Sequence, residues 1–170
     1  IALAVYSPIP GSSNKYINLG KNIDENTQLN FKSPYGCSKG SSDQYVSDYS
    51  STFGLNTIVL RLSCIYGPNQ WGTEDQGWIS WFIIKALKKE KINIFGNGKQ
   101  VRDVLFIDDL VNLISKCISK KKLNGEVYNI GGGSKNTFSL LDLIHYLKKI
   151  TKNNINYKLS KSRIGDQKYF

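Results

Sequence analysis

The chain has 170 residues, of which 40% are hydrophobic and 12% aromatic, which is enough for a buried core and argues against a disordered protein. No apolar run approaches the roughly 18 residues that a membrane-spanning helix needs. Cys37, Cys64 and Cys117 are far apart and lack CxxC spacing, which argues against a disulfide framework or a zinc site and favours reduced thiols in the cytoplasm.

The formal net charge is +10 at pH 7, and a basic protein of this kind could bind nucleic acid. The lysines, however, fall mostly at the ends of predicted helices, where a cation complements the helix dipole. We therefore interpret the charge as that of a solvated surface and expect no nucleic-acid partner and no membrane partner. Because the chain lacks methionine and begins in an apolar run at Ile1, we interpret it as an internal piece of a longer polypeptide.

The first elements are predicted in the N-terminal third of the chain. Residues 1–6 are apolar, as at the end of a buried strand, and a polar loop follows to about residue 32. A helix of about five turns is predicted to begin at Pro34, which is well tolerated in a first helical turn, and to end at Gly54. The β-branched and apolar stretch 56–63 predicts a central strand that is buried on both faces.

The remainder of the chain alternates between helices and short strands. Asp108 and Asp109 are expected to cap one of these helices and Ser139 another. The alternation predicts an α/β fold with a largely parallel sheet. Helices are predicted at 77–90, 110–120 and 140–150, and strands at 92–95, 104–107, 126–130 and 155–159.

A phosphate-binding loop for a dinucleotide is missing from this pattern. No G-x-G-x-x-G follows a predicted strand, and the glycines at 131–133 lack both the spacing and the following helix start that a pyrophosphate requires. If a dinucleotide binds, we expect its phosphate loop upstream of Ile1.

Tyr35 and Lys39 are four residues apart at the start of the first predicted helix, so their side chains can converge on one ligand. A free tyrosine titrates near 10, and a nearby lysine cation stabilises its phenolate. Lowering the pKa by about three units requires roughly 4 kcal/mol, which is attainable in a partly desolvated site. Such a tyrosine could act as a general base, although the spacing alone also fits a solvated helix face.

Four segments together resemble one protein family in their order and spacing. They are "SPYGCSK", "LRLSCIYGPNQ", "GNGKQVRDVLFIDDL" and "YNIGGG", and they resemble the extended short-chain dehydrogenase/reductase family of nucleotide-sugar epimerases and dehydratases. The resemblance extends from about Val5 to Gln167. The stretches "SPYGCSKGSSDQY", "FGLNT" and "DQGWISWF" are most similar to a subgroup of 2-epimerases that act on CDP-linked sugars.

The resemblance implies the C-terminal portion of a Rossmann-type doubly wound parallel sheet plus a small α/β substrate-binding domain. Residues 1–66 with 101–130 would belong to the NAD-binding part, and 67–100 with 131–170 to the nucleotide-sugar region. It also implies a tightly held NAD, transient oxidation of the sugar at C2 with return of hydride to the opposite face, and a homodimer of the full-length chain.

The family's roles are carried over where the motifs match. Tyr35 matches the catalytic tyrosine, and Lys39 matches the lysine that binds the nicotinamide ribose and lowers the tyrosine pKa. Ser63 is expected at the cofactor. Cys64 occupies a position that contacts the sugar in relatives, where Asn or Ser is common, and the alternative is a small buried thiol.

Further positions are expected to bind the substrate. Arg102 matches an arginine that grips the nucleotide diphosphate, which an arginine can do bidentately. Arg163 and Asp166 match a late R-x-x-D that contacts phosphate and sugar, the alternative being a surface ion pair. Trp78 and Phe82 are expected near the sugar, although aromatic residues at helical spacing are also typical of a core.

Two residues are interpreted as departures or as structural. The family places a Ser or Thr that hydrogen-bonds the reacting hydroxyl where this sequence has Ala2, and alanine cannot make that bond. His145 has no His, Cys or carboxylate partner at metal-ligand spacing, so we expect a surface or boundary side chain and no metal site.

The alternatives to a 2-epimerase are a 4-epimerase, 4,6-dehydratase or reductase of the same family, and a truncated module that binds only a nucleotide or a partner.

Overall fold

The computed structural model describes residues 24–31, 33–120 and 122–163. The first helix in this part of the chain is α2 (Pro34–Phe53), whose N-cap Ser33 accepts a hydrogen bond from the Gly36 N–H. Gly54 ends the helix in a left-handed conformation with φ of 66°, which glycine adopts at little cost. Both predicted boundaries of this helix are confirmed.

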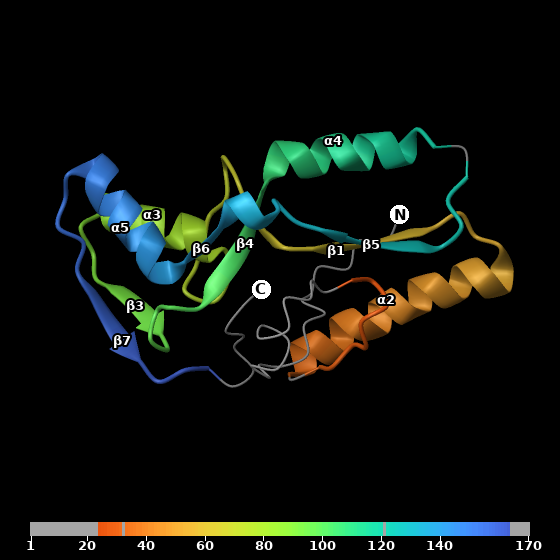
Figure 1. Cartoon of the computed structure of the whole chain (residues 1–170), viewed down its shortest axis with the longest axis horizontal. Coiled ribbons are helices and arrows are strands. Elements are labelled where there is room, and N and C mark those ends of the chain that lie inside the picture. Colours follow the sequence, from red (N-terminus) through yellow and green to blue (C-terminus); the bar gives the residue numbers. More distant parts are fainter. Residues whose placement is uncertain (1–23, 32, 121, 164–170) are drawn as a thin grey trace.

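A pair of parallel strands lies between two helices (Figure 1). The strands are β1 (Ile58–Leu62) and β5 (Glu126–Ile130), and all five residues of β1 are buried. The alternate residues Ile58, Leu60 and Leu62 pack towards α4 (Ile107–Ile118), whereas Val59 packs towards Val46 of α2. The predicted strand buried on both faces is therefore confirmed, because each face is covered by a helix.

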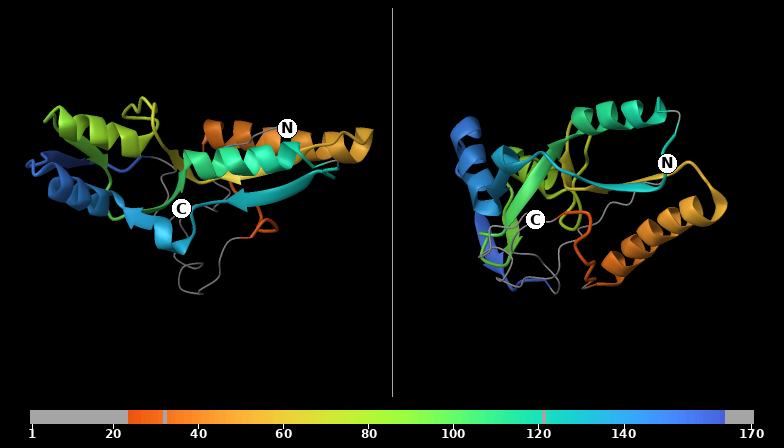
Figure 2. Two further views of the ribbon diagram at one scale, coloured as in Figure 1. Left: turned by 90° about the horizontal axis from the view of Figure 1, so that it is seen from above. Right: turned by 45° about the vertical axis from the view of Figure 1, so that its right-hand side comes forward.

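The rest of the described chain forms a second group of short strands with two helices (Figures 1 and 2). Strand β4 pairs in parallel with β2 and antiparallel with β6, and β3 pairs in parallel with β7. Helix α3 packs against α5 on this group. The elements are β2 (Cys64–Tyr66), α3 (Trp78–Leu87), β3 (Ile92–Phe95), β4 (Val101–Phe106), the 3₁₀ turn η1 (Ser134–Asn136), β6 (Thr137–Ser139), α5 (Leu140–Thr151) and β7 (Tyr157–Ser160).

Strand β4 joins the two larger hydrophobic clusters of the described residues. Its Val104 packs into the cluster of α3, β3 and α5, and the adjacent Leu105 packs into the cluster of β1 and α4. Successive side chains of a strand point to opposite faces, so one short strand contributes to both clusters. The α/β fold class with parallel sheets is confirmed, whereas the domain boundaries given above stay a prediction.

The expected caps were right for one helix and wrong for another. Ser139 accepts from the Asp142 N–H while the Asp142 carboxylate accepts from the Ser139 N–H, so α5 begins with a capping box. Helix α4, however, begins at Ile107 directly after β4, and its N-cap is Phe106. Asp108 and Asp109 therefore lie inside the first turn, where they complement the helix dipole without capping it.

Two further expectations concern the surface. His145 is exposed on α5, as predicted. Among the described residues, no helix is long and apolar enough to cross a membrane.

Candidate functional site

Tyr35 and Lys39 lie on one face of the N-terminal half of α2. The Lys39 Nζ lies 5.6 Å from the centroid of the Tyr35 ring, so the two groups do converge as the spacing predicted. At the next residue, Gly40, the backbone of α2 packs closely against the ring of Phe31. A Cβ on Gly40 would lie 1.9 Å from the Phe31 ring, so only glycine lets the helix rest on Phe31.

Ser63 and Cys64 lie where β1 passes into β2. The Ser63 N–H donates to the Ile130 carbonyl at 2.9 Å, while its hydroxyl is buried without a hydrogen-bond partner among the described residues. Burial raises the pKa of the Cys64 thiol, and the nearby Trp78 indole and the Arg102 charge offset only part of this effect. Cys64 is therefore a neutral thiol at pH 7.

A cavity of about 630 Å³ opens between α2, the β1–β2 junction, α3 and β4. Its apolar lining comes from residues such as Leu62, Ile65, Phe95 and Leu140, and its polar lining includes hydroxyl, carboxylate, amide and guanidinium groups. This volume lies within the range typical of small-molecule and cofactor sites. Every predicted site residue that the structure describes lines it: Tyr35, Lys39, Ser63, Cys64, Trp78, Phe82, Arg102 and Arg163.

The two arginines of the cavity come from distant parts of the sequence. Arg102, on β4, donates from Nη1 to the Val101 carbonyl at 2.9 Å. Arg163 donates to the Glu74 carbonyl at 3.0 Å, pairs with the Asp75 carboxylate at 2.8 Å, and stacks with its Cζ 4.0 Å from the centroid of the Phe95 ring. Asp166, predicted to act with Arg163, lies outside the described residues, as does Ala2.

Trp78 and Phe82 belong both to the cavity lining and to the core. They lie one turn apart on α3 with ring centroids 5.7 Å apart, and Trp78 also meets Phe138 edge-on at 5.8 Å. Phe82 is only 3% exposed. Both side chains line the cavity and pack in or against the core, as the structural alternative expected, whereas their contact with the sugar stays a prediction.

Several lining residues were not predicted as site residues. They come mainly from the loop between β2 and α3, which was expected to belong to the nucleotide-sugar region but in which no single residue was predicted to bind, and they include carboxylates. Gly72 allows this loop to pack closely, because a Cβ there would lie 2.5 Å from the Trp81 nitrogen. The sequence signal for this part of the site was the run of polar residues, 73–76, between Gly72 and Gly77. The additional polar lining residues are Gln70, Glu74, Asp75, Gln76, Asn93 and Gln100.

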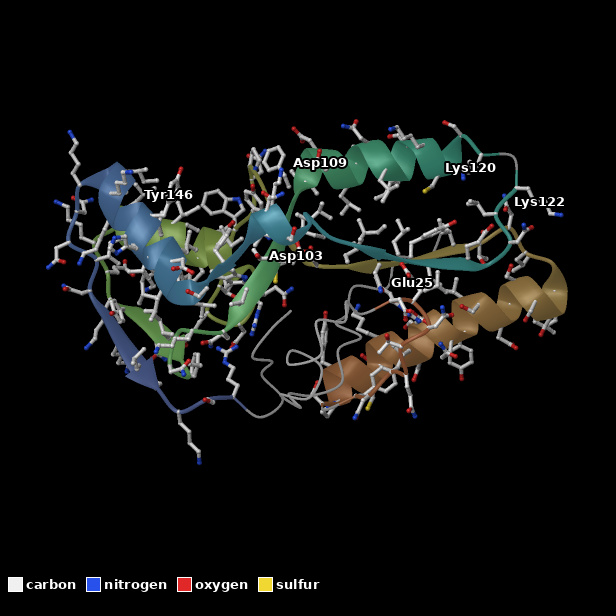
Figure 3. The ribbon with its side chains drawn as sticks, in the orientation of Figure 1. Glu25, Asp103, Asp109, Lys120, Lys122 and Tyr146 are labelled. Atoms are coloured by element: carbon white, nitrogen blue, oxygen red, sulfur yellow. The ribbon has the colours of Figure 1, made fainter. Side chains whose placement is uncertain are left out.

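The three glycines at 131–133 bind a carboxylate of the chain itself. The Gly132 N–H donates to Asp103 Oδ1 at 2.7 Å, and the Gly133 N–H lies 3.4 Å from Oδ2. Asp103 is labelled on β4 in Figure 3. These glycines therefore hold β4, the strand that carries Arg102, which agrees with the expectation that they do not form a dinucleotide phosphate loop.

The cavity lining combines a phenol, an ammonium group, two guanidinium groups and a buried hydroxyl that has no hydrogen-bond partner among the described residues. The phenol, ammonium and hydroxyl groups suit hydroxyl and ribose groups, and the guanidinium groups suit phosphate. A fold of this type with such a site defines a class of nucleotide-binding oxidoreductases and isomerases. Residues 9–131 match the model of the NAD dependent epimerase/dehydratase family, and the chain belongs to that family.

Two curated relatives illustrate the range of the family. The chain is 46% identical over 153 residues to CDP-paratose 2-epimerase of Salmonella typhi, covering 86% of this chain and 45% of the relative. It is 33% identical over 145 residues to dTDP-glucose 4,6-dehydratase 1 of Escherichia coli, covering 84% of this chain and 39% of the relative. The chain thus spans less than half the length of these relatives.

Solved structures support the same fold. UDP-glucuronic acid 4-epimerase from Bacillus cereus, in complex with UDP-glucuronic acid and NAD, superposes with a TM-score of 0.84 at 30% identity and covers 98% of this chain and 50% of its own. UDP-glucose 4-epimerase of Thermus thermophilus, in complex with NAD, gives a TM-score of 0.84 at 22% identity, covering 98% of this chain and 52% of its own. The Rossmann-type fold expected from the sequence is confirmed.

Proposed function

We propose that this chain is the C-terminal part of an NAD-dependent nucleotide-sugar epimerase, and that the full-length protein is a CDP-paratose 2-epimerase. The observation that carries the proposal is the meeting of Tyr35 and Lys39 with Arg102 and Arg163 around one cavity. The 46% identity to the Salmonella typhi enzyme supports the choice of a CDP-sugar.

Tyr35 is the acid/base residue in this proposal. Its phenolate removes a proton from the C2 hydroxyl of the sugar, the resulting phenol returns that proton after the ring has turned, and Lys39 holds the ribose and supports the phenolate. When bound, NAD supplies the chemistry of accepting a hydride and returning it to the other face of the sugar. The buried Ser63 hydroxyl, unpartnered among the described residues, is a group of the size and polarity that this cofactor end needs.

The remaining lining residues bind the substrate. Arg102 and Arg163 bind the diphosphate. Arg102 lies on β4 and Arg163 follows β7, and their two guanidinium groups can donate several charge-assisted hydrogen bonds to it. Asp166, next to Arg163 in the sequence motif, contacts the sugar. Trp78, Phe82 and Cys64 shape the apolar side of the sugar pocket.

The direct test uses the full-length polypeptide that contains this chain. We expect it to copurify with NAD and to interconvert CDP-paratose and CDP-tyvelose, measured by separation of the two nucleotide sugars. Tyr35→Phe should lower kcat by a factor on the order of 100 or more, while Tyr146→Phe, at an exposed tyrosine of α5 outside the cavity lining, should leave kcat unchanged. Full turnover by Tyr35→Phe would sink the proposal.

A second candidate keeps the family chemistry and changes the substrate. A putative UDP-glucose 4-epimerase of Methanocaldococcus jannaschii is 35% identical over 125 residues, and the Escherichia coli dehydratase is 33% identical. A panel of CDP-paratose, UDP-glucose and dTDP-glucose separates these activities. Turnover of UDP-glucose or dTDP-glucose alone would replace the CDP-sugar assignment with one of them.

We further propose that the full-length protein is a cytoplasmic homodimer. An exposed aromatic stripe on α2, made of Tyr45, Tyr49 and Phe53 at four-residue spacing, supports an interface along this helix. Light scattering of the full-length protein should give twice the mass of one chain, and Tyr49→Asp should shift it to the monomer.

A further inference from the structure

Asp43 and Arg61 form a buried ion pair outside the cavity lining. Arg61 Nε donates to Asp43 Oδ2 at 2.8 Å and its Nη2 donates to Oδ1 at 3.2 Å, so the guanidinium and carboxylate are joined by two bonds. The Asp43 side chain is 0% exposed and that of Arg61 5%. A two-bond contact of this kind fixes orientation as well as distance.

The pair joins the two elements that carry the proposed reactive groups. Asp43 lies one turn after Lys39 and two turns after Tyr35, on the same face of α2. Arg61 lies two residues before Ser63 on β1, and so about 7 Å from it along the strand. A shift of α2 along β1 would therefore move Tyr35 and Lys39 relative to Ser63 by the same amount.

A third segment closes the connection. Arg61 Nη1 donates to the Glu25 carbonyl at 3.0 Å, and the Glu25 carboxylate accepts from the Asn129 N–H of β5 at 2.6 Å. Asn129 is the register partner of Arg61 across the two strands. Figure 3 shows Glu25 between the β1/β5 pair and α2. Arg61, the strand side of the ion pair, is thus tied to both strands independently of the helix.

Within the part of the chain that the structure describes, few apolar contacts hold α2 against the β1/β5 pair. The buried residues of the helix are Gly40 and Asp43, and Val59 of β1 packs against Val46 and the ring of Phe31. Apolar contacts are non-directional, and so small an apolar surface leaves the axial position of the helix weakly fixed. Among the described residues, the two-bond contact at Asp43 and the close packing of Gly40 on Phe31 together set where the start of α2 lies.

We propose that Arg61 and Asp43 are positioning residues, which set the register of α2 on β1 and thereby the distance of Tyr35 and Lys39 from the reacting sugar and cofactor. This role rests on the proposed function. A buried ion pair is a poor source of net stability, because desolvation of the two charges offsets their attraction. The pair therefore contributes a fixed geometry between α2 and β1 rather than net stability.

The test is Arg61→Lys in the full-length protein. Lysine keeps the charge that compensates Asp43 but replaces the two-bond fork with a point charge. We expect kcat to fall roughly tenfold to a hundredfold with KM for the nucleotide sugar within about twofold, since misplacement of the order of 1 Å has costs of this size. Asp43→Asn should give the same split, whereas Asp48→Asn, an exposed aspartate on the same helix, should change neither constant.

Amide hydrogen exchange gives a readout that needs no turnover. In Arg61→Lys, we expect faster exchange over residues 37–43 of α2 and unchanged exchange in α5, even if the wild-type protein acts on none of the sugars tried. Wild-type kcat in Arg61→Lys, or unchanged exchange in α2, would overturn the positioning role. Failure of both Arg61→Lys and Asp43→Asn to fold would also overturn it, because the pair would then be a requirement of folding.

Discussion

Arg163 is already bound by the chain itself at the mouth of the cavity. Its guanidinium donates to the Glu74 carbonyl, and the Asp75 carboxylate lies 2.8 Å away. The Asp75 side chain is 86% exposed, so this pair is solvated and weak. In the proposed complex a diphosphate competes with Asp75 for the same cation.

We therefore predict that Asp75→Asn tightens binding of CDP to the full-length protein. The expected gain is roughly 1.4-fold to fivefold, equivalent to the 0.2–1 kcal/mol of an exposed ion pair, and it should shrink in high salt. Calorimetric titration measures it, with Asp48→Asn as a control of equal charge outside the cavity. Unchanged or weaker binding would show that Asp75 does not compete with the diphosphate.

Asp103 and the glycines after β5 depend on each other. A Cβ on Gly131 would lie 2.2 Å from Asp103 Oδ2, so we predict that Gly131→Ala destabilises the fold by about 1–3 kcal/mol through displacement of that carboxylate. Denaturant unfolding measures the loss. Gly36→Ala is the matched control, because its nearest contact would be 3.4 Å away and alanine favours helix, so it should cost nothing.

At the scale of an element, α5 shows how local chemistry fixes a helix start. The Ser139 hydroxyl and N–H both donate to the Asp142 carboxylate, which lowers the pKa of Asp142. Because the pKa of Asp142 is lower in the folded state than in the unfolded state, its ionisation stabilises the fold at every pH above the unfolded-state pKa of about 3.9. This contribution is lost as the pH falls through the folded-state pKa.

We predict that Ser139→Ala lowers the free energy of unfolding at pH 7 by about 0.5–2 kcal/mol, the usual cost of a lost N-cap. The difference from wild type should shrink as the pH falls below about 3.9 and through the lower folded-state pKa of Asp142, because below that pKa Asp142 is protonated in both proteins. Urea unfolding across this pH range measures it. Asp109→Asn, which removes a first-turn carboxylate that is not part of a capping box, should cost less; an equal cost would contradict the role of the box.

At the scale of the whole molecule, β4 connects two hydrophobic clusters through the neighbouring residues Val104 and Leu105. If β4 detaches from one of these clusters, it exposes the apolar side chains of the other cluster as well. We predict one cooperative unfolding transition. The fluorescence of Trp78 and Trp81, which reports on the α3 cluster, should change over the same range of denaturant as the far-ultraviolet circular dichroism signal, which reports on the helices. A fluorescence transition that precedes the loss of helix would contradict this coupling.

The helices and strands followed from local chemistry. Pro34 and Gly54 marked the ends of α2, alternation of helix and strand indicated the fold class, and the motif order indicated the family. The capping of α4 was missed because β4 runs into the helix without a loop, so Phe106 rather than an aspartate occupies the N-cap. Neighbouring residues alone cannot show where one element ends and the next begins in such a case.

The sequence by itself pointed to Tyr35 with Lys39 by residue type and spacing, and to Arg102 and Arg163 through the motifs that resemble the family. Only the tertiary structure decided that loop carboxylates face Arg163, that Asp103 occupies the glycine loop, and that Asp43 is joined to Arg61. These contacts join residues 18 to 88 positions apart (163 minus 75 is 88), and such pairings depend on how strands and helices pack. Local sequence rules describe single elements, whereas a site is made where several elements meet.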